Sequence, residues 1–272
     1  MPSRTHPRCW RLLNAERLEA LPAALMRPRA RANADARSLA RADWLIRRKD
    51  DGRFLAVRRD DLILPLFRGA IPFRLEGDLA ELASSAAEPY ELRPLGDLTA
   101  HLDELGLDAD AYAEHSGLPL VAEPRTLAFA GLDRYRRPLW LTDDAASAWS
   151  DMRAAAYDDG IELDAISGYR SHAYQLGIFR RKRERGLSVD DILAVNAAPG
   201  FSEHHSGNAL DIGAPDEPPA EESFENTAAF AWLCENAASF NFHLSYPREN
   251  PHGIVYEPWH WCWSSNEQGA EN

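Results

Sequence analysis

The segment 200–213 is the feature that most constrains how this chain can fold. It reads GFSEHHSGNALDIG and places two imidazoles on a glycine-flanked turn, followed by Asp211 in a short predicted strand, 209–212. A turn that leads into a strand can bring side chains seven positions apart onto one metal ion, and imidazole and carboxylate are ligands suited to zinc. Neighbours on an extended chain face opposite ways, so only one of His204 and His205 can easily point inward. The residues alone leave that choice open.

A second informative segment, 242–263, is predicted to form a closing hairpin. Glu257 and His260 lie three positions apart in it, which on a regular strand would put them on opposite faces. Pro258 cannot donate a ladder hydrogen bond and favours a bulge, so a local irregularity can turn both side chains inward. His260 would then supply a third ligand and Glu257 a base beside an open fourth position, as a hydrolytic zinc site requires.

Arg170 is the third element of the predicted site. It lies in the sequence SGYRS, 167–171, directly after a strand predicted over 161–166. An arginine at a strand end can clamp a carboxylate or stabilise an oxyanion. Each element is weak alone, and their combination is what indicates metal-dependent hydrolysis.

Charge and cysteine content exclude several other classes of protein. The net charge is −13, yet the first 60 residues carry 15 Lys and Arg against 7 Asp and Glu. The acidic remainder argues against a surface that tracks phosphates, so no nucleic-acid partner is expected. Three cysteines without a CxxC pair exclude a disulfide framework and a cysteine-based zinc finger.

The basic head of the chain bears on location. Glu16, Arg17 and Glu19 interrupt the apolar positions, whereas an export signal needs an apolar run of about 7 to 15 residues. No stretch reaches the roughly 18 apolar residues of an integral membrane segment. We therefore expect a cytoplasmic location for the chain as written, with the periplasm or cell envelope as the alternative if the true start lies upstream. The head, up to about Ala42, is interpreted as a solvated amphipathic helix rather than an anchor on an anionic surface.

Local patterns predict the remaining elements. Two apolar runs, 44–46 and 54–57, flank an Asp-Gly pair and predict a hairpin in an N-terminal α+β module. Thr142 is predicted to cap a helix with alanines at helical spacing. The other predictions are a strand over 139–141 and three helices. These helices cover 98–107, the segment that follows SGYRS up to Lys182, and 188–194.

Four blocks of the sequence resemble the VanY-like D-alanyl-D-alanine carboxypeptidases and their dipeptidase relatives, zinc enzymes of bacterial cell-wall metabolism. The resemblance covers roughly residues 125–263, and it implies an α+β fold with a central antiparallel sheet and flanking helices, shared with the hedgehog signalling domain. We therefore expect a catalytic domain over 123–272 and a smaller N-terminal α+β region over 1–122, of unknown role. The blocks are SGYRS (167–171) with Gln175 following, SEHHSGNALDI (202–212), FHLSYP (242–247) and EPWHW (257–261).

The resemblance also implies roles for individual residues. It makes Glu257 the general base and gives Arg170 the task of polarising the scissile carbonyl. It favours His204 over His205 as a ligand, and His172 is interpreted as a helix-start residue. The implied ligands of one Zn²⁺ ion are His204, Asp211 and His260; the implied substrate contacts are Ser202, Gln175 and Trp259; the histidines interpreted as non-ligands are His205, His243 and His252.

The expected function is that of a zinc metallocarboxypeptidase. It would remove a C-terminal D-Ala from a peptidoglycan stem peptide or muropeptide by attack of water that Glu257 activates. The alternatives are an L,D-carboxypeptidase or a D-Ala-D-Ala dipeptidase acting on muropeptides. A non-catalytic, zinc-stabilised binding module is disfavoured, because a structural site has no use for Glu257 and Arg170. The sequence does not indicate an oligomeric state.

Overall fold

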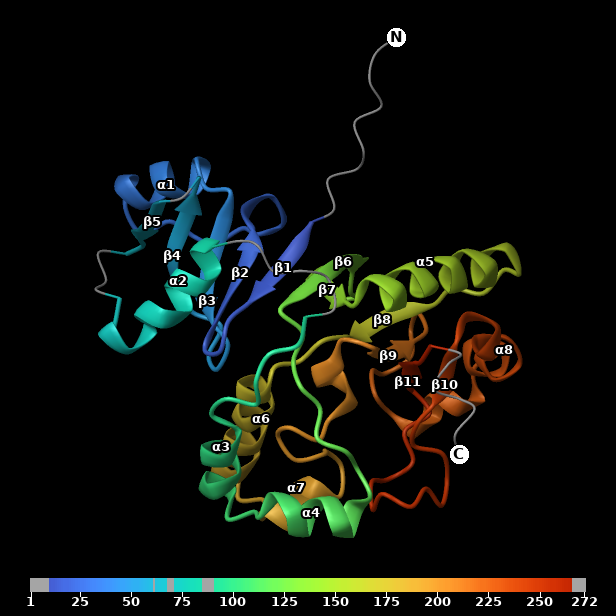
Figure 1. The fold of residues 1–272 in the computed structure, drawn as a ribbon. Coiled ribbons are helices and arrows are strands. Elements are labelled where there is room, and N and C mark those ends of the chain that lie inside the picture. Colours follow the sequence, from blue (N-terminus) through green and yellow to red (C-terminus); the bar gives the residue numbers. More distant parts are fainter. Residues whose placement is uncertain (1–9, 61, 68–70, 85–90, 266–272) are drawn as a thin grey trace.

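A computed structural model describes residues 10–60, 62–67, 71–84 and 91–265. Two antiparallel sheets organise these residues (Figure 1), and the predicted α+β class is confirmed. The larger sheet contains, in spatial order, β5 (Leu62–Pro65), β4 (Phe54–Arg59), β3 (Trp44–Arg48), β2 (Leu18–Pro22), β1 (Arg11–Asn14), β6 (Thr126–Leu132) and β7 (Pro138–Leu141). The smaller sheet contains β10 (Phe242–Leu244), β11 (His260–Trp263), β9 (Ala209–Gly213) and β8 (Asp164–Ser167).

Helices cover these sheets and fill the space between them. All four predicted helices are present: the one over 98–107, the one after Thr142, the one that ends near Lys182 and the one over 188–194. The Thr142 side chain accepts a hydrogen bond from the amide of Ala145. The strand predicted over 161–166 begins later, at Asp164. The α-helices are α1 (Asn33–Ala40), α2 (Glu76–Ser84), α3 (Leu98–Leu105), α4 (Ala109–Ser116), α5 (Asp143–Asp158), α6 (His172–Glu184), α7 (Val189–Leu193) and α8 (Ala228–Asn236).

The basic head differs from its prediction. Its first part, residues 1–9, lies outside the described residues, and the segment from Arg11 to Pro22 forms the hairpin β1–β2 rather than an amphipathic helix. Both faces of β2 are covered, so all five of its residues are buried and the alternation typical of a strand is not visible in the sequence. The described part of the head is helical only in a short 3-10 helix, Ala23–Leu25, and near its end, as α1. The hairpin predicted over 44–57 is confirmed as β3–β4.

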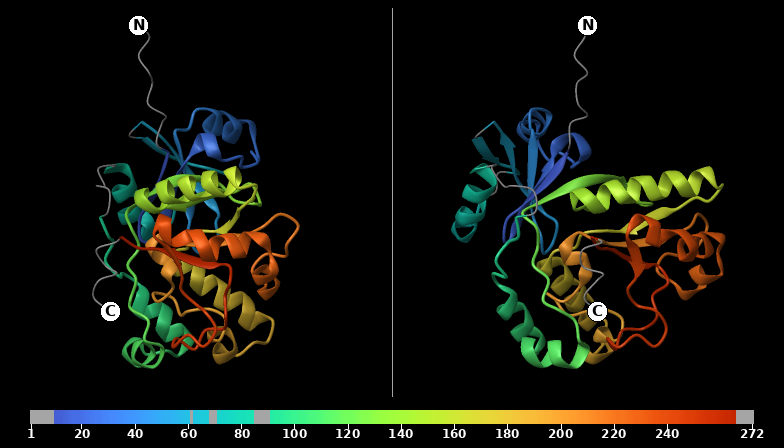
Figure 2. Two further views of the ribbon diagram at one scale, coloured as in Figure 1. Left: turned by 90° about the vertical axis from the view of Figure 1, so that its right-hand side faces the viewer. Right: turned by 45° about the vertical axis from the view of Figure 1, so that its right-hand side comes forward.

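The larger sheet joins the N-terminal region to the rest of the chain. Strand β1 pairs with β6, with Leu12 opposite Leu127, so strands from both sides of position 122 lie in one sheet. The division into 1–122 and 123–272 therefore stays a prediction about function rather than a visible break in the fold. Figure 2 shows α5 extending from this sheet over the smaller one.

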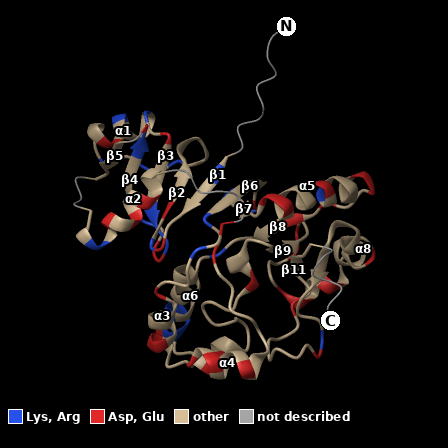
Figure 3. Ribbon diagram, in the orientation of Figure 1, with Lys and Arg blue, Asp and Glu red and all other residues tan. Residues whose placement is uncertain are grey.

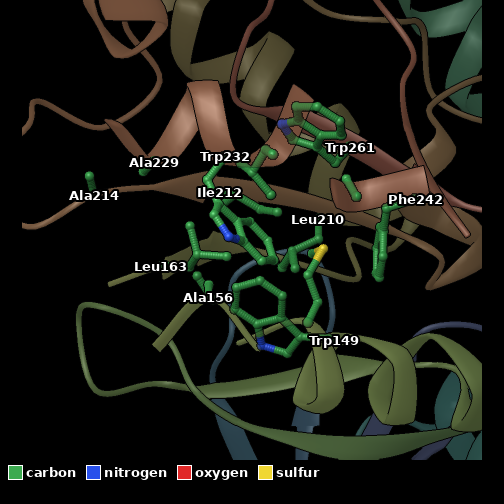
Figure 4. Packing of buried hydrophobic residues seen from close by; sticks show 14 of the residues in the cluster. Trp149, Ala156, Leu163, Leu210, Ile212, Ala214, Ala229, Trp232, Phe242 and Trp261 are labelled. Atoms are coloured by element: carbon green, nitrogen blue, oxygen red, sulfur yellow. The ribbon is translucent and has the colours of Figure 1, made fainter. Parts of the chain in front are cut away.

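The core beneath the smaller sheet holds β9 and β11 in place. Trp149 and Met152 of α5 are fully buried against Leu210 and Ile212 of β9, and Trp261 of β11 closes the same cluster (Figure 4). The face of β9 and β11 that points away from this core can carry polar side chains. A rigid sheet is a suitable base for a site that needs fixed geometry.

A buried ion pair lies where the N-terminal strands of the larger sheet meet the loop after β8. The Lys49 ammonium contacts the Glu123 carboxylate, and their side chains are only 1% and 7% exposed. Glu123 also accepts hydrogen bonds from the amide of His172 at 2.7 Å and the hydroxyl of Tyr169 at 2.8 Å. Asn14 of β1 donates to the same carboxylate. The carboxylate thus connects three separate segments of the chain.

None of the described helices is long and apolar enough to cross a membrane.

Candidate metal centre

Three buried side chains converge at the paired ends of β9 and β11. The register places His260 directly opposite Asp211, and the 3-10 helix η3 (Glu203–Ser206) brings His204 to the same point just before β9 begins. One ligand atom from each of these residues lies within 4.8 Å of the other two. The seven-residue spacing predicted from the sequence is thus realised by a turn of 3-10 helix followed by a strand.

The hydrogen bonds of His204 leave one of its nitrogens available to a cation. Its Nδ1 lies 2.7 Å from the carbonyl oxygen of Gly168, which can only accept, so Nδ1 carries the proton. Its Nε2 then presents a lone pair, 3.2 Å from Asp211 Oδ1, and has no hydrogen-bond partner among the described residues although it is buried. Two acceptors that face each other in a buried site favour a cation between them, because neither can satisfy the other.

His260 has the same arrangement with its nitrogens exchanged. Its Nε2 lies 2.8 Å from Glu203 Oε2, whereas its Nδ1 lies 3.2 Å from Asp211 Oδ1. Burial alone would lower the pKa of His260, but the carboxylates of Asp211 and Glu203 raise it to about 10. Burial, and then Arg170, lower the pKa of His204 to about 4. Without a metal, a proton on His260 supplies the positive charge, and a metal ion would displace that proton.

Glu257 lies at the edge of this cluster. Its Oε2 is 3.8 Å from His260 Nδ1, and its side chain is 13% exposed. The amide of His260 donates to the carbonyl of Glu257 across a turn at Pro258, so the irregularity proposed from the sequence does put both side chains on one side. Burial raises the pKa of Glu257 to about 7. A carboxyl group with this pKa can take up and release a proton near neutral pH.

Arg170 reaches the same cluster from the loop after β8. Its amide donates to the carbonyl of His204 at 3.1 Å, which fixes the loop against η3. Its Nη2 lies 3.6 Å from Asp211 Oδ2, and its Nε is buried without a hydrogen-bond partner among the described residues. The guanidinium therefore has an unused donor beside the candidate ligands.

A cavity of about 320 Å³ opens over the cluster, and all the predicted catalytic residues, metal ligands and substrate contacts line it. Gln175 is buried; its Nε2 donates to the carbonyl of Ala197, and its Oε1 has no described partner. Such an unpaired acceptor can receive a hydrogen bond from a ligand. The predicted residues on the cavity wall are Arg170, Gln175, Ser202, His204, Asp211, Glu257, Trp259 and His260.

The histidines interpreted as non-ligands, together with His172, lie outside the three-residue cluster. His205 is fully buried beside His204, but its ring nitrogens contact the carbonyl of Arg170 and the amide of Gly200. His172 is the first residue of α6. His252 contacts the carbonyl of Ser116, and His243 is exposed near Glu203.

Glu203 is a candidate functional residue that the sequence reasoning missed. Burial alone would raise the pKa of Glu203, but the hydrogen bond from His260 lowers this pKa to about 2. The carboxylate therefore stays ionised. A carboxylate on the outer nitrogen of a metal-binding histidine fixes the ring orientation and its tautomer. The available signal was its position next to His204, but its partner lies 57 positions later in the chain.

Residues 138–266 match the sequence profile of the family described as VanY: D-alanyl-D-alanine carboxypeptidase. We name this segment the VanY-like domain, after the family that it resembles. The VanY-like domain contains the converging residues His204, Asp211 and His260. It also contains Glu257, Arg170 and Glu203. Strands β1 to β5 lie outside the matched segment, as do β6 and helices α1 to α4.

Individual proteins resemble this part of the chain. YodJ of Bacillus subtilis, to which carboxypeptidase activity is assigned provisionally, is 38% identical over 128 residues, 44% of this chain and 45% of its own. A D-alanyl-D-alanine carboxypeptidase of Enterococcus faecium is 35% identical over 100 residues, 36% of this chain and 31% of its own. The chain thus spans less than half of either relative. The solved structure of the L,D-carboxypeptidase LdcB is 32% identical, with a TM-score of 0.44, over 47% of this chain and 61% of that one.

Gly207, which ends η3, is expected to tolerate no side chain. Its φ is +75°, and a Cβ there would lie 2.4 Å from Leu127 Cδ2 and 3.3 Å from the amide nitrogen of Thr142. We expect Gly207→Ala to lower the free energy of unfolding by about 2–4 kcal/mol, from left-handed strain together with overpacking. Chemical denaturation measures it. The matched control is Gly160→Ala, which has a φ of +78° and open space around it, and equal losses in both variants would contradict the packing argument.

Proposed function

We propose that this protein is a zinc-dependent metallopeptidase that removes a C-terminal D-amino acid, D-Ala, from peptidoglycan-type peptides. The observation that carries the proposal is the convergence of possible ligand atoms from His204, Asp211 and His260 in a buried site, with Glu257 beside them. The similarity to VanY-like carboxypeptidases supports the choice of reaction and substrate.

The donor set fits one zinc ion. His204 would bind through Nε2, His260 through Nδ1 and Asp211 through a carboxylate oxygen. Two imidazoles and a carboxylate are typical of catalytic zinc sites, which keep a further position open. When bound, zinc supplies a Lewis acid that polarises a carbonyl oxygen and acidifies water.

Glu257 would act as the general base and then as the general acid. Its carboxylate takes a proton from the attacking water as the new carbon–oxygen bond forms at the scissile carbonyl. It then passes that proton to the amine of the departing D-amino acid as the carbon–nitrogen bond breaks. The pKa of Glu257, raised by burial to about 7, is matched to this two-way transfer.

Arg170 would stabilise the developing negative charge on the carbonyl oxygen. Its unused Nε donor lies inside the site, and its guanidinium is held near Asp211 before substrate arrives. Donors fixed in advance contribute most in a dry, enclosed site. Gln175, Ser202 and Trp259, on the cavity wall, would contact the terminal residues of the peptide.

The test is an assay of product identity. The zinc-loaded protein is incubated with a stem pentapeptide, the matching tetrapeptide and free D-Ala-D-Ala, and the products are identified by mass. We expect loss of one D-Ala from the pentapeptide. Cleavage of the tetrapeptide alone would assign an L,D-carboxypeptidase, and cleavage of the free dipeptide alone a dipeptidase. Absence of product from all three would contradict the proposal.

The cytoplasmic location expected from the sequence also stays a prediction, which cell fractionation tests.

Glu203→Gln is expected to weaken zinc binding about 10- to 100-fold, the usual effect of removing the carboxylate behind a metal-binding histidine. The amide keeps the size of the side chain but removes the charge that orients His260 at 2.8 Å. Competition with a zinc chelator measures the affinity. The matched control is Glu162→Gln, an exposed position outside the cavity lining. Zinc affinity equal to that of the control would show that Glu203 does not position His260.

A further inference from the structure

A second and larger cleft lies on the other side of the loop that carries Arg170. Its volume is about 610 Å³, within the usual range for small-ligand sites. The larger sheet forms one wall through β1, β2 and the β3–β4 turn, and residues 25–27, the segments 133–140 and 167–171, and α6 contribute the other lining residues. It therefore exists only where the N-terminal region meets the VanY-like domain.

The lining of this cleft is basic, although the chain as a whole carries a net charge of −13. Seven Lys and Arg line it against four Asp and Glu, and Figure 3 shows Lys and Arg on α6 and in the β3–β4 hairpin. The basic residues are Arg27, Arg47, Lys49, Arg136, Arg137, Arg170 and Arg181, and the acidic ones are Glu19, Asp50, Asp51 and Asp133.

The carboxylates of the cleft are already neutralised by partners. Arg47 contacts Glu19 at 2.5 Å, and Arg137 contacts Asp133 at 2.6 Å. Asp50 pairs with Arg48, and Asp51 pairs with Arg48 and Arg53; neither arginine is part of the lining. The surplus positive charge of the cleft is therefore not cancelled from within.

Three of the arginines carry that surplus. Arg27, Arg136 and Arg181 are exposed, and within the described part of the chain no carboxylate forms an ion pair with any of them. The Arg27 guanidinium donates to the carbonyls of Ala24 and Met26. Arg181 lies over the ring of Tyr174, 5.4 Å from its centroid. These groups can each accept an anionic partner without breaking an existing ion pair.

The floor of the cleft is apolar. Leu12, Leu21 and Trp140 are buried in one cluster there, and Leu25 and Met26 pack against it. An apolar floor with separate cationic groups at the rim fits a ligand that bears carboxylates on a partly apolar frame. A long polyanion fits poorly, because the acidic body around the cleft would repel it.

We propose that this cleft is a second binding site, which takes an acidic peptide a few residues long. It goes beyond the proposed hydrolysis, because its cationic rim residues are neither candidate metal ligands nor the general base. The two sites share Arg170, and neighbouring faces of α6 line them, with Tyr174 and Arg181 on the cleft and Gln175 and Lys182 on the metal cavity.

The test compares two capped peptides that cannot be cleaved at a free C-terminus. Acetyl-Ala-Glu-Ala-Glu-amide and its Gln analogue are titrated into the metal-free full chain by calorimetry. We expect the Glu peptide to bind about three- to tenfold more tightly at low salt, the scale of two exposed ion pairs, and this preference to be lost at high salt. Because neither zinc nor turnover enters the measurement, its outcome is independent of the proposed peptidase activity.

Matched variants locate the binding. The double variant Arg136→Ala/Arg181→Ala should lose the preference for the Glu peptide, whereas Arg74→Ala/Arg153→Ala, with the same change in charge at exposed positions outside the cleft, should keep it. Equal binding of the two peptides by the wild-type chain, or a preference that survives in the first double variant, would overturn the proposal. Tighter binding of a short oligonucleotide than of the Glu peptide would do so as well.

Discussion

A Glu257→Gln variant is expected to bind zinc as the wild type does and to hydrolyse the peptide about 10²- to 10⁴-fold more slowly. The amide fills the same space 3.8 Å from His260 Nδ1 but cannot accept the proton of the attacking water. Because Glu257 is not one of the three converging ligands, its replacement should leave the metal in place. The measurements are the zinc content of the purified protein and kcat/KM on the peptide that the product assay identifies.

The control for this variant is Glu235→Gln, an exposed change of the same kind on α8. It should retain both zinc and activity. Turnover within a few-fold of wild type in Glu257→Gln would remove the general base from the mechanism. Loss of zinc from the same variant would instead make Glu257 a ligand, and either result would require a different assignment of the site.

Lys49→Met is expected to cause the largest loss of stability, about 3–5 kcal/mol in the free energy of unfolding, because it leaves a buried carboxylate without its counter-ion. Lys49 is 1% exposed, and its ammonium also donates to the carbonyl of Ala15 at 2.7 Å. Methionine keeps the length of the side chain, so packing is largely preserved. Urea denaturation measures the difference. The control is Arg53→Met in the same hairpin, where the side chain is 79% exposed and a change within about 0.5 kcal/mol is expected.

The same pair sets a dependence of stability on pH. Burial alone would raise the pKa of Glu123, but Lys49 and His172 hold it well below its usual value. A depressed folded-state pKa contributes stability that is fully present above the unfolded pKa, 4.5, and is lost as the pH falls toward the folded pKa. The wild type should therefore lose stability below about pH 4.5 more steeply than Lys49→Met, in which the pKa of Glu123 is less depressed. Parallel pH profiles would contradict this account.

The candidate ligands could be predicted from the sequence because their geometry is mostly local. His204 and Asp211 are connected by η3 and the first residues of β9. Asp211 and His260 lie opposite each other in the pairing of β9 with β11. The structure brings these side chains together, and their assignment as zinc ligands stays a prediction until metal is measured. The hairpin over 44–57 was likewise marked by its own turn residues.

Other features could not be predicted because distant segments determine them. Strand β2 is covered on both faces, so its buried residues show no period of two. The role of Glu203 depends on the outer nitrogen of His260. The basic cleft is assembled from separate stretches of the chain that show no pattern individually, and it includes an ion pair between β2 and β3, Glu19 with Arg47, that only the fold creates.

The place of β1 in the larger sheet has a consequence for synthesis of the chain. Strands β1 to β5 leave the ribosome before β6 and can pair as successive hairpins, but the second neighbour of β1 is β6, Thr126–Leu132. Until that segment emerges, β1 presents an open edge to other nascent chains. An expression clone that begins at residue 138, where the family similarity begins, would encode β7 without β6, its one neighbour among the described strands. The ends of a folding unit here are therefore better chosen from strand pairing than from similarity.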